Sequence, residues 1–255
     1  TWTLSGANTY IGGTSVSLGT LALSGGSAIA DAGAVNLGVA AANLTLNANE
    51  TIGSLSGVAG TTVTLGANTL STGDANSTSY AGVISGTGGL TKQGSGTFTL
   101  SGANTYSGKI SILDGALSVA SINSVVGGAA SSNLGAPTTG LSGTIDLGSG
   151  ASTGTLVYTG VGETTDRVIN LAGAGGGGTI DQSAAAGLLK YTSALTAAAG
   201  AKTLTLQGSA AGSGEFAGVI GDGAGTTALV KAVSGTWTLS GANTYSGGTT
   251  IQSGT

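Results

Sequence analysis

The chain has 255 residues, of which 51 are glycine, and it carries only 6 Lys and Arg and 10 Asp and Glu. It has no Cys and no His, which excludes disulfides, thiolate nucleophiles, cysteinyl metal sites and the one side chain that titrates near neutrality without perturbation. A net charge of −4 with few, scattered basic residues argues against nucleic acid and anionic membrane surfaces as partners, because both need clustered Lys and Arg.

Hydropathy separates a folded chain from a disordered linker. Hydrophobic residues make up 40% of the chain and its mean hydropathy is +0.36, whereas disorder requires low hydrophobicity together with high net charge. We therefore expect a folded protein. No segment approaches the roughly 20 consecutive apolar residues of a membrane-spanning helix, so no membrane span is expected in this segment.

Pairs of apolar residues two positions apart recur along the chain, with Thr, Ala or Asp between the two members. This period of two predicts short β-strands, and the Gly, Ser and Asn residues between them predict corners. An Ala-rich stretch at 183–190 favours a turn or two of helix. The pairs are Trp2/Leu4, Leu21/Leu23, Leu44/Leu46, Val63/Leu65, Phe98/Leu100, Ile145/Leu147, Leu204/Leu206 and Trp237/Leu239.

The first ten residues of the chain return twice. Residues 1–10 recur at 97–106 with one change, Trp to Phe, and at 236–245 with none. The second and third copies also share an upstream Ala-Gly-Val-Ile and a Leu-x-Lys. Residues 236–255 match residues 1–20 at 15 of 20 positions, so we interpret the chain as a window of a longer repetitive protein.

The unit between repeated strand pairs is roughly 20 residues long, since Leu44 follows Leu21 by 23 residues and Val63 follows Leu44 by 19. Four or five inward apolar side chains contribute about 1.5 to 3 kcal/mol each. Ordering ~20 residues of backbone costs on the order of 20 to 40 kcal/mol, so a single coil is not stable alone. Coils must stack, which predicts an all-β, parallel, right-handed β-helix solenoid of about a dozen coils.

We expect one continuous solenoid over residues 1–255. Its repeat copies are expected at 1–23 (partial), 80–120 and 216–255 (cut at the C-terminal end), and its spacer coils at 24–79 and 121–215.

Three sets of repeated residues have expected roles. The apolar members of the repeated strand should form the core: Trp2, Leu4, Phe98, Leu100, Trp237 and Leu239. Asn residues just beyond a strand should occupy the left-handed region, bond the neighbouring backbone and stack as a ladder: Asn8, Asn68, Asn104 and Asn243. Tyr residues after Asn-Thr are candidates for lateral contacts between rods: Tyr10, Tyr106 and Tyr245.

Candidate chemistry is sparse. Glu163, Asp166 and Arg167 form the densest charged cluster, and β-helix polysaccharide lyases and hydrolases use Asp, Arg and Lys on one face. General acid–base catalysis needs two positioned groups with shifted pKa values, and no second cluster is visible. The preferred interpretation is a solvated loop with a local Asp/Arg pair. We therefore predict no enzyme activity, no catalytic residue, no metal and no cofactor.

The segment 80–108 carries a recognisable order of motifs, Tyr-Ala-Gly-Val-Ile-Ser-Gly, then Leu-Thr-Lys, then Gly-Thr-Phe-Thr-Leu-Ser-Gly-Ala-Asn-Thr-Tyr-Ser-Gly. This order resembles the autotransporter-associated β-strand repeat, also called the passenger-associated transport repeat. The resemblance implies a secreted bacterial surface protein with a β-helix passenger, and it implies no catalytic residues. Lys109 and Asp114 depart from the pattern.

Three functions fit these observations. The first is a structural shaft or filament at the cell surface, with the long repeat presenting one face at regular intervals. The second is an adhesin that binds glycans, host matrix or sibling rods. The third and most distant is ice binding through outward Thr-x-Thr pairs. Expected partners are other copies of the chain, end to end or laterally in fibres, and a glycan or host surface, at an extracellular bacterial location.

Overall fold

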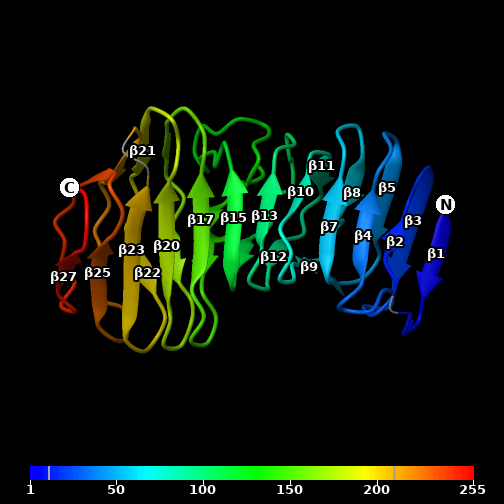
Figure 1. Ribbon diagram of the computed structural model, residues 1–255, viewed down its shortest axis with the longest axis horizontal. Coiled ribbons are helices and arrows are strands. Elements are labelled where there is room, and N and C mark those ends of the chain that lie inside the picture. Colours follow the sequence, from blue (N-terminus) through cyan, green and yellow to red (C-terminus); the bar gives the residue numbers. More distant parts are fainter. Residues whose placement is uncertain (11, 209–210) are drawn as a thin grey trace.

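The computed structural model describes residues 1–10, 12–208 and 211–255. It confirms an all-β, parallel solenoid, with about 11 turns of about 23 residues each. The coils follow one another along the long axis of the molecule, with the N-terminus at one end and the C-terminus at the other (Figure 1). Among the described residues no helix is long and apolar enough to span a membrane.

Four parallel sheets form the sides of the coils. The long sheet contains, in order, β2 (Thr14–Ser15), β4 (Ala34–Leu37), β7 (Ser54–Gly57), β10 (Thr78–Tyr80), β13 (Thr97–Leu100), β15 (Gly115–Val119), β17 (Gly154–Tyr158), β20 (Gly177–Gln182), β23 (Lys202–Gly208), β25 (Thr227–Lys231) and β27 (Thr249–Ile251). The seven-stranded sheet contains β22 (Thr196–Ala197), β19 (Ile169–Leu171), β16 (Ile145–Leu147), β14 (Ile110–Ile112), β12 (Leu90–Lys92), β9 (Leu70–Thr72) and β6 (Glu50–Ile52).

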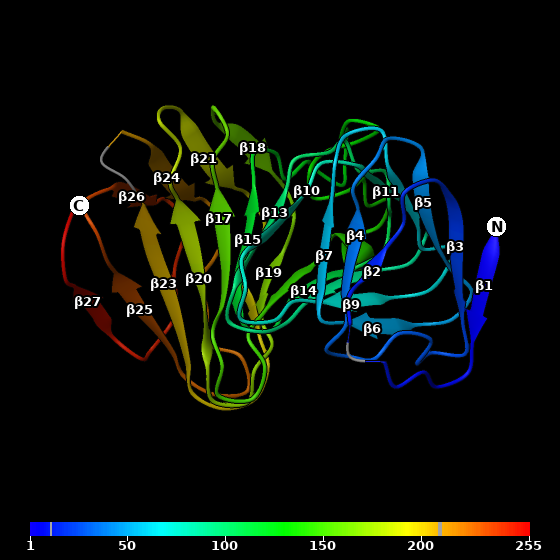
Figure 2. The same ribbon diagram turned by 45° about the vertical axis from the view of Figure 1, so that its right-hand side comes forward.

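The remaining strands form two shorter sheets. The five-stranded sheet contains β1 (Trp2–Ser5), β3 (Gly19–Ser24), β5 (Ala42–Leu46), β8 (Thr62–Thr64) and β11 (Val83–Ser85). The four-stranded sheet contains β18 (Glu163–Thr165), β21 (Leu188–Tyr191), β24 (Ser213–Phe216) and β26 (Thr236–Leu239). In Figure 2, β6, β9 and β14 run across the direction of β4 and β7, so the seven-stranded sheet is a separate side of the coil.

Most coils contain between 19 and 26 residues, and one is much longer. In the long sheet Phe98 pairs with Leu117, 19 residues further on, and Ile180 pairs with Leu206, 26 further on. Leu117, however, pairs with Leu156, which is 39 residues further on. The extra residues leave the solenoid between β15 and β16, and we call residues 120–144 the insertion loop. It contains the short helix α1 (Gly140–Gly143).

Alternate residues of each strand point inward, and their apolar side chains merge into one core along the rod. Phe98 and Leu100 are fully buried, whereas Leu4 and Leu239 are partly buried against this core. The predicted burial of Trp2 is not observed, since 71% of its surface is exposed on the first described coil. The equivalent Trp237 is only 9% exposed, since the preceding coil covers it.

The corners rely on close contact between coils. A Cβ at Gly102 would lie 1.8 Å from the carbonyl oxygen of Gly82 on the preceding coil, so only glycine fits there. The prediction that the ladder Asn residues adopt positive φ is wrong: Gly66, two positions before Asn68, has φ 59°, whereas the non-Gly residues with positive φ in the described chain lie elsewhere. Glycine has no Cβ penalty in this region and therefore takes the strained position. The expected helix at 183–190 is also absent, because residues 188–191 form β21.

Candidate functional site

Side-chain oxygens at one type of corner tie each coil to the coil before it. The Oδ1 atom of Asn104 accepts the backbone N–H of Ile84 at 2.7 Å. The neighbouring coil therefore satisfies a buried donor that the strand ladder leaves unpaired. The same bond recurs from Ile220 to Asn243 (2.8 Å), from Ile29 to Glu50 (2.7 Å) and from Ile122 to Glu163 (2.5 Å).

The other two ladder residues use their amide groups instead. Asn8 Nδ2 donates to the carbonyl oxygen of Ala28 at 2.8 Å, and Asn68 Nδ2 donates to that of Leu46 at 3.0 Å. In all four cases the side chain of the Asn contacts backbone of an adjacent coil. The role of Glu50 and Glu163 in equivalent bonds was not visible in the sequence, because neither residue follows the Gly-Ala-Asn-Thr motif.

A buried lysine fastens a second type of corner. Lys92 is 1% exposed, and its Nζ donates to the carbonyl oxygens of Gln93 (2.8 Å), Gly94 (2.7 Å) and Asp114 (3.2 Å). The first two acceptors belong to its own corner and the third to the next coil. Burial lowers the pKa of Lys92, and the carboxylates of Asp114 and Asp74 oppose that shift.

Lys231 repeats this arrangement residue for residue. Its Nζ donates to the carbonyl oxygens of Ala232 (2.8 Å), Val233 (2.7 Å) and Ser253 (3.1 Å), which stand at the same three offsets along the chain. Burial also lowers the pKa of Lys231. Each lysine therefore acts as a fixed cation that holds together carbonyl oxygens of two coils.

Arg167 anchors the insertion loop. It is 1% exposed, and its side chain donates three hydrogen bonds to carbonyl oxygens of that loop. Nε donates to Gly143 (2.8 Å), and Nη1 donates to Leu134 (2.9 Å) and Ile122 (3.2 Å). Burial lowers the pKa of the guanidinium to about 10, and the nearby Tyr106 and Tyr191, followed by Glu163 and Asp166, oppose that shift.

The two carboxylates of this cluster also bind backbone of the loop. Asp166 accepts the N–H groups of Val125 (2.6 Å) and Val126 (2.9 Å), and Glu163 accepts that of Ile122. Burial raises the pKa of Glu163, and the backbone N–H groups that it binds oppose that shift. The interpretation of this cluster as a solvated loop with a local Asp/Arg pair is wrong, because Arg167 is buried and Asp166 binds backbone N–H groups. We call residues 163–167 the clamp.

The insertion loop forms one wall of a cavity of about 450 Å³. Its lining is uncharged and combines hydroxyl groups with small apolar side chains: Thr105, Ser107, Ser124, Val125, Gly128, Ala129, Ala130, Ala136, Pro137 and Thr138. The volume falls within the range of small-molecule sites.

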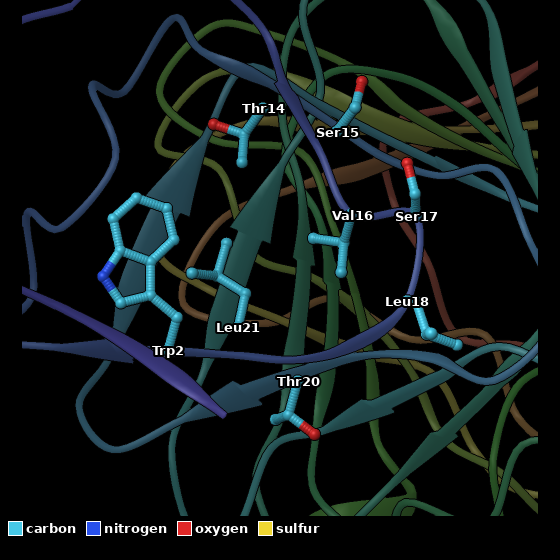
Figure 3. Close-up of a pocket in the computed structure, with 8 residues that line it drawn as sticks. All are labelled: Trp2, Thr14, Ser15, Val16, Ser17, Leu18, Thr20 and Leu21. Carbon is cyan, nitrogen blue, oxygen red and sulfur yellow. The ribbon is translucent and has the colours of Figure 1, made fainter.

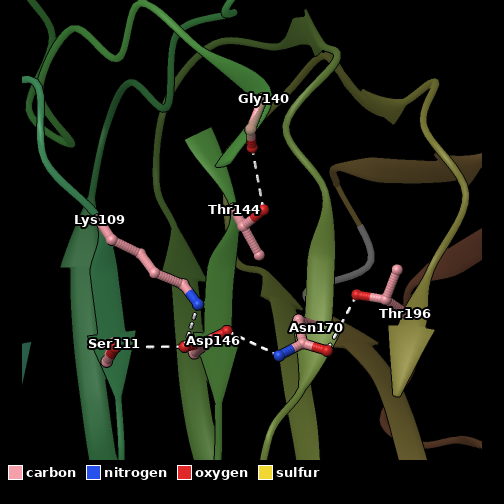
Figure 4. Close-up of polar contacts among 7 residues, drawn as sticks. All are labelled: Lys109, Ser111, Gly140, Thr144, Asp146, Asn170 and Thr196. Carbon is pink, nitrogen blue, oxygen red and sulfur yellow. Dashed lines mark hydrogen bonds and ion pairs between the residues drawn. The ribbon is translucent and has the colours of Figure 1, made fainter. Parts of the chain in front are cut away.

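The seven-stranded sheet carries a polar row on its outer face. Asp146 accepts Lys109 Nζ (2.6 Å), Asn170 Nδ2 (2.7 Å) and Ser111 Oγ (3.5 Å), while Asn170 accepts Thr196 Oγ1 (2.9 Å), as Figure 4 shows. Lys109, which departs from the repeat pattern, is therefore the ion-pair partner of Asp146. In register, the row consists of Thr51, Ser71, Thr91, Ser111, Asp146, Asn170 and Thr196.

The first and last described coils each have an open apolar cleft, and the two clefts share equivalent residues. At the first coil a cleft of about 330 Å³ lies between Trp2, Val16, Leu18 and Leu21 (Figure 3). At the last coil a smaller cleft of about 100 Å³ contains Trp237 and Ile251, which correspond to Trp2 and Val16. Within the described residues no group of three or more Asp, Glu, His or Cys side chains is placed to hold a metal ion.

The comparisons with known proteins agree with the repeat arrangement. The model of the passenger-associated-transport-repeat family matches residues 1–23, 90–119 and 229–255. The chain carries passenger-associated transport repeats. It is also 38% identical over 247 residues to the adhesin BmaC autotransporter of Brucella suis biovar 1 (strain 1330). The match covers 93% of this chain and 7% of that relative, and no solved structure matches. These similarities place the chain outside the cell, at the bacterial surface.

The transport repeats do not all occupy the same side of the solenoid. The Leu-x-Lys strand lies in the seven-stranded sheet as β12 in one repeat and in the long sheet as β25 in another. The Thr-x-Thr strands β1, β13 and β26 lie in three different sheets. In the first and last copies, however, β1 and β26 are each followed by a strand of the long sheet, β2 and β27. The expectation that the long repeat presents one face at regular intervals therefore stays a prediction. The lysine bonds are nevertheless identical in both repeats, so they are a local property of the motif.

The tyrosines of the transport repeats differ in exposure. Tyr10 and Tyr245 each share a hydrogen bond of 2.7 Å with the threonine four residues later, Thr14 and Thr249. Tyr106 has Ile110 at that position and is 1% exposed. The insertion loop covers it, with Ala136 N–H donating to its carbonyl oxygen at 2.8 Å. The prediction that Tyr106 makes lateral contacts between rods is therefore wrong.

Proposed function

We propose that this segment is a non-enzymatic shaft of a bacterial surface adhesin, which carries other contact sites away from the cell. The long sheet supports this proposal most directly, because it runs without interruption from β2 to β27. A rod of about 11 turns at the ~4.8 Å strand spacing is on the order of 50 Å long. The corner bonds of Asn104 and Lys92 and their equivalents add coil-to-coil links that resist bending and pulling.

The clamp supports the non-enzymatic part of the proposal. Arg167 donates to backbone carbonyl oxygens, and Asp166 and Glu163 accept backbone N–H groups. The polar groups of these side chains therefore stabilise the fold. Catalysis on a polysaccharide would need at least two such groups free to contact the substrate.

Electron microscopy of the purified chain and of fibres on intact cells tests the shaft. We expect thin, unbranched rods whose length grows in proportion to the number of coils. Compact, isotropic particles from the same chain would contradict the proposal. Small-angle scattering of the 255-residue chain provides an independent check, since a rod and a sphere of equal mass differ in radius of gyration.

The relative is named an adhesin, and direct adhesion by this segment is the second candidate. The insertion loop favours it, because loops on a rigid scaffold are common positions for binding residues. Beads coated with the chain, compared with beads coated with a variant in which Arg167→Met loosens this loop, should adhere more strongly to host-cell surfaces. Equal adhesion of the two would argue against the loop as the contact.

Self-association of the rods into fibres, end to end or laterally, is a further part of the proposal. The chain carries only 6 Lys and Arg and 10 Asp and Glu, so charge repulsion does little to oppose contact between the sides of two rods. Sedimentation should therefore depend on concentration, and a sedimentation coefficient that stays constant over a wide range of concentration would argue against self-association. Ice binding is not favoured, since the Thr-x-Thr strands are spread over three sheets.

A further inference from the structure

The cavity beside the insertion loop has a fixed shape. Asp166 holds Val125 through its backbone N–H, and Asn123 bonds both the N–H and the carbonyl oxygen of Ala129 at 2.8 Å. The opposite wall belongs to the solenoid, where the N–H of Ser107 donates to Gly86 at 2.9 Å. Because both walls are held by the fold, a ligand would not have to order them on binding.

The lining of the cavity selects an uncharged ligand. No Lys, Arg, Asp or Glu lines it, so a charged group would lose its hydration without gaining a counter-charge. The side-chain hydroxyls of Thr105, Ser107 and Thr138 form no hydrogen bond with any described residue and can both donate and accept. The apolar side chains of Ala136 and Pro137 also line the cavity.

A neutral sugar matches this combination. A hexose ring presents hydroxyl groups at its rim and C–H groups on its faces, and it carries no charge. A cavity of about 450 Å³ has room for a monosaccharide or a terminal disaccharide, at the lower end of the volumes of small-molecule sites. No Trp, Tyr or Phe lines the cavity to stack on a sugar face, so affinity per site should be weak, on the order of millimolar. Many copies on one cell would compensate through avidity.

We propose that this cavity is a binding site for the terminal neutral sugar of a glycan, with Thr105, Ser107 and Thr138 as its hydrogen-bonding groups. This inference rests on the proposed function only for its location at the cell surface. It names the chemistry that an adhesive contact of the insertion loop would use. The clamp residue Asp166 is a positioning residue in this site, since it holds the Val125 wall and does not line the cavity.

Saturation-transfer NMR and calorimetry on the full chain test the site. The probes are methyl glycosides of neutral hexoses and N-acetylhexosamines, with N-acetylneuraminic acid as the charged counterpart. We expect saturable binding of at least one neutral glycoside and none of the acid. Thr138→Val and Ser107→Ala should each weaken binding several-fold, whereas Thr20→Val, which removes a hydroxyl from the cleft at the first coil, should not change it.

The positioning role of Asp166 has its own readout. Asp166→Ala should weaken sugar binding and also speed hydrogen exchange at residues 125–126, and Asp166→Asn should restore part of both. The proposal is overturned if no neutral glycoside saturates the chain, if Thr138→Val and Ser107→Ala leave binding unchanged in folded protein, or if the acidic sugar binds equally well. Rods in electron micrographs together with such a negative result would leave the shaft function intact and remove only the sugar site.

Discussion

Arg167→Met is the perturbation that tests the clamp most sharply. Methionine keeps an unbranched apolar stem but removes the guanidinium and its three bonds to Ile122, Leu134 and Gly143. Leaving a buried carbonyl oxygen without its donor costs about 1 to 3 kcal/mol. Three such losses are partly offset, because the variant no longer has to bury a positive charge. The lowered pKa of Arg167 shows that burial of this charge is unfavourable. A net loss of about 3 kcal/mol is consistent with removing one partner from other buried charged clusters.

This loss should appear as opening of the insertion loop rather than unfolding of the rod. Since each 1.4 kcal/mol changes an equilibrium tenfold, hydrogen exchange in residues 120–144 should become about 100-fold faster. Peptides from β20 and β23 should keep their protection. Mass spectrometry of exchanged peptides at neutral pH measures both regions in one experiment.

Lys190→Met is the matched control, because it removes a cation from a partly exposed ion pair with Glu215 (2.9 Å). Exposed ion pairs contribute little to stability, so exchange near β21 should change little. Unchanged exchange in residues 120–144 of Arg167→Met would refute the reasoning, as would equal acceleration along the whole long sheet.

Three further predictions concern single side chains. Burial raises the pKa of Glu163 above its ordinary 4.5, so the folded state binds the proton more readily than the unfolded state. The contribution of this group to stability should therefore rise as pH falls from neutral through the folded pKa. Glu163→Gln should remove this pH dependence of the free energy of unfolding, measured by urea titrations at several pH values. Lys92→Met and Lys231→Met should each lower the free energy of unfolding by about 2 kcal/mol, because each leaves three carbonyl oxygens without a charged donor. A thermal denaturation midpoint equal to that of the parent chain would contradict this prediction. Tyr106→Phe should be neutral or stabilising by up to about 1 kcal/mol, since the buried hydroxyl has no partner among the described residues. A clear loss of stability in calorimetry would contradict this, because it would mean that the hydroxyl makes a stabilising hydrogen bond.

The fold could be predicted from the sequence because its main signal is local. Leu90 and Lys92, like Leu229 and Lys231, share the inward phase of a strand, and that phase is visible in the alternation itself. The same alternation could have indicated that the two lysines are buried, because an inward lysine needs fixed acceptors. Stacking of the coils could also be predicted, because one coil has too few apolar side chains to be stable alone.

The remainder depends on contacts between distant residues. Arg167 reaches Ile122, 45 residues earlier, and nothing in the immediate sequence of Arg167 indicates that an extra loop covers it. The burial of Tyr106 has the same cause. The side of the solenoid on which a repeat lies depends on the summed lengths of all preceding coils. A small error in the predicted number of residues at each corner therefore assigns a strand to the wrong sheet. Local patterns therefore predicted the strands but not the sheets to which they belong.

Residue-resolved native-state hydrogen exchange along the long sheet tests most directly whether the coils depend on one another. If each coil is stabilised mainly by its neighbours, protection should be highest in β13, β15 and β17 and should decline gradually toward β2 and β27. Protection that varies from coil to coil with the composition of each coil, with no decline toward the ends, would contradict the account.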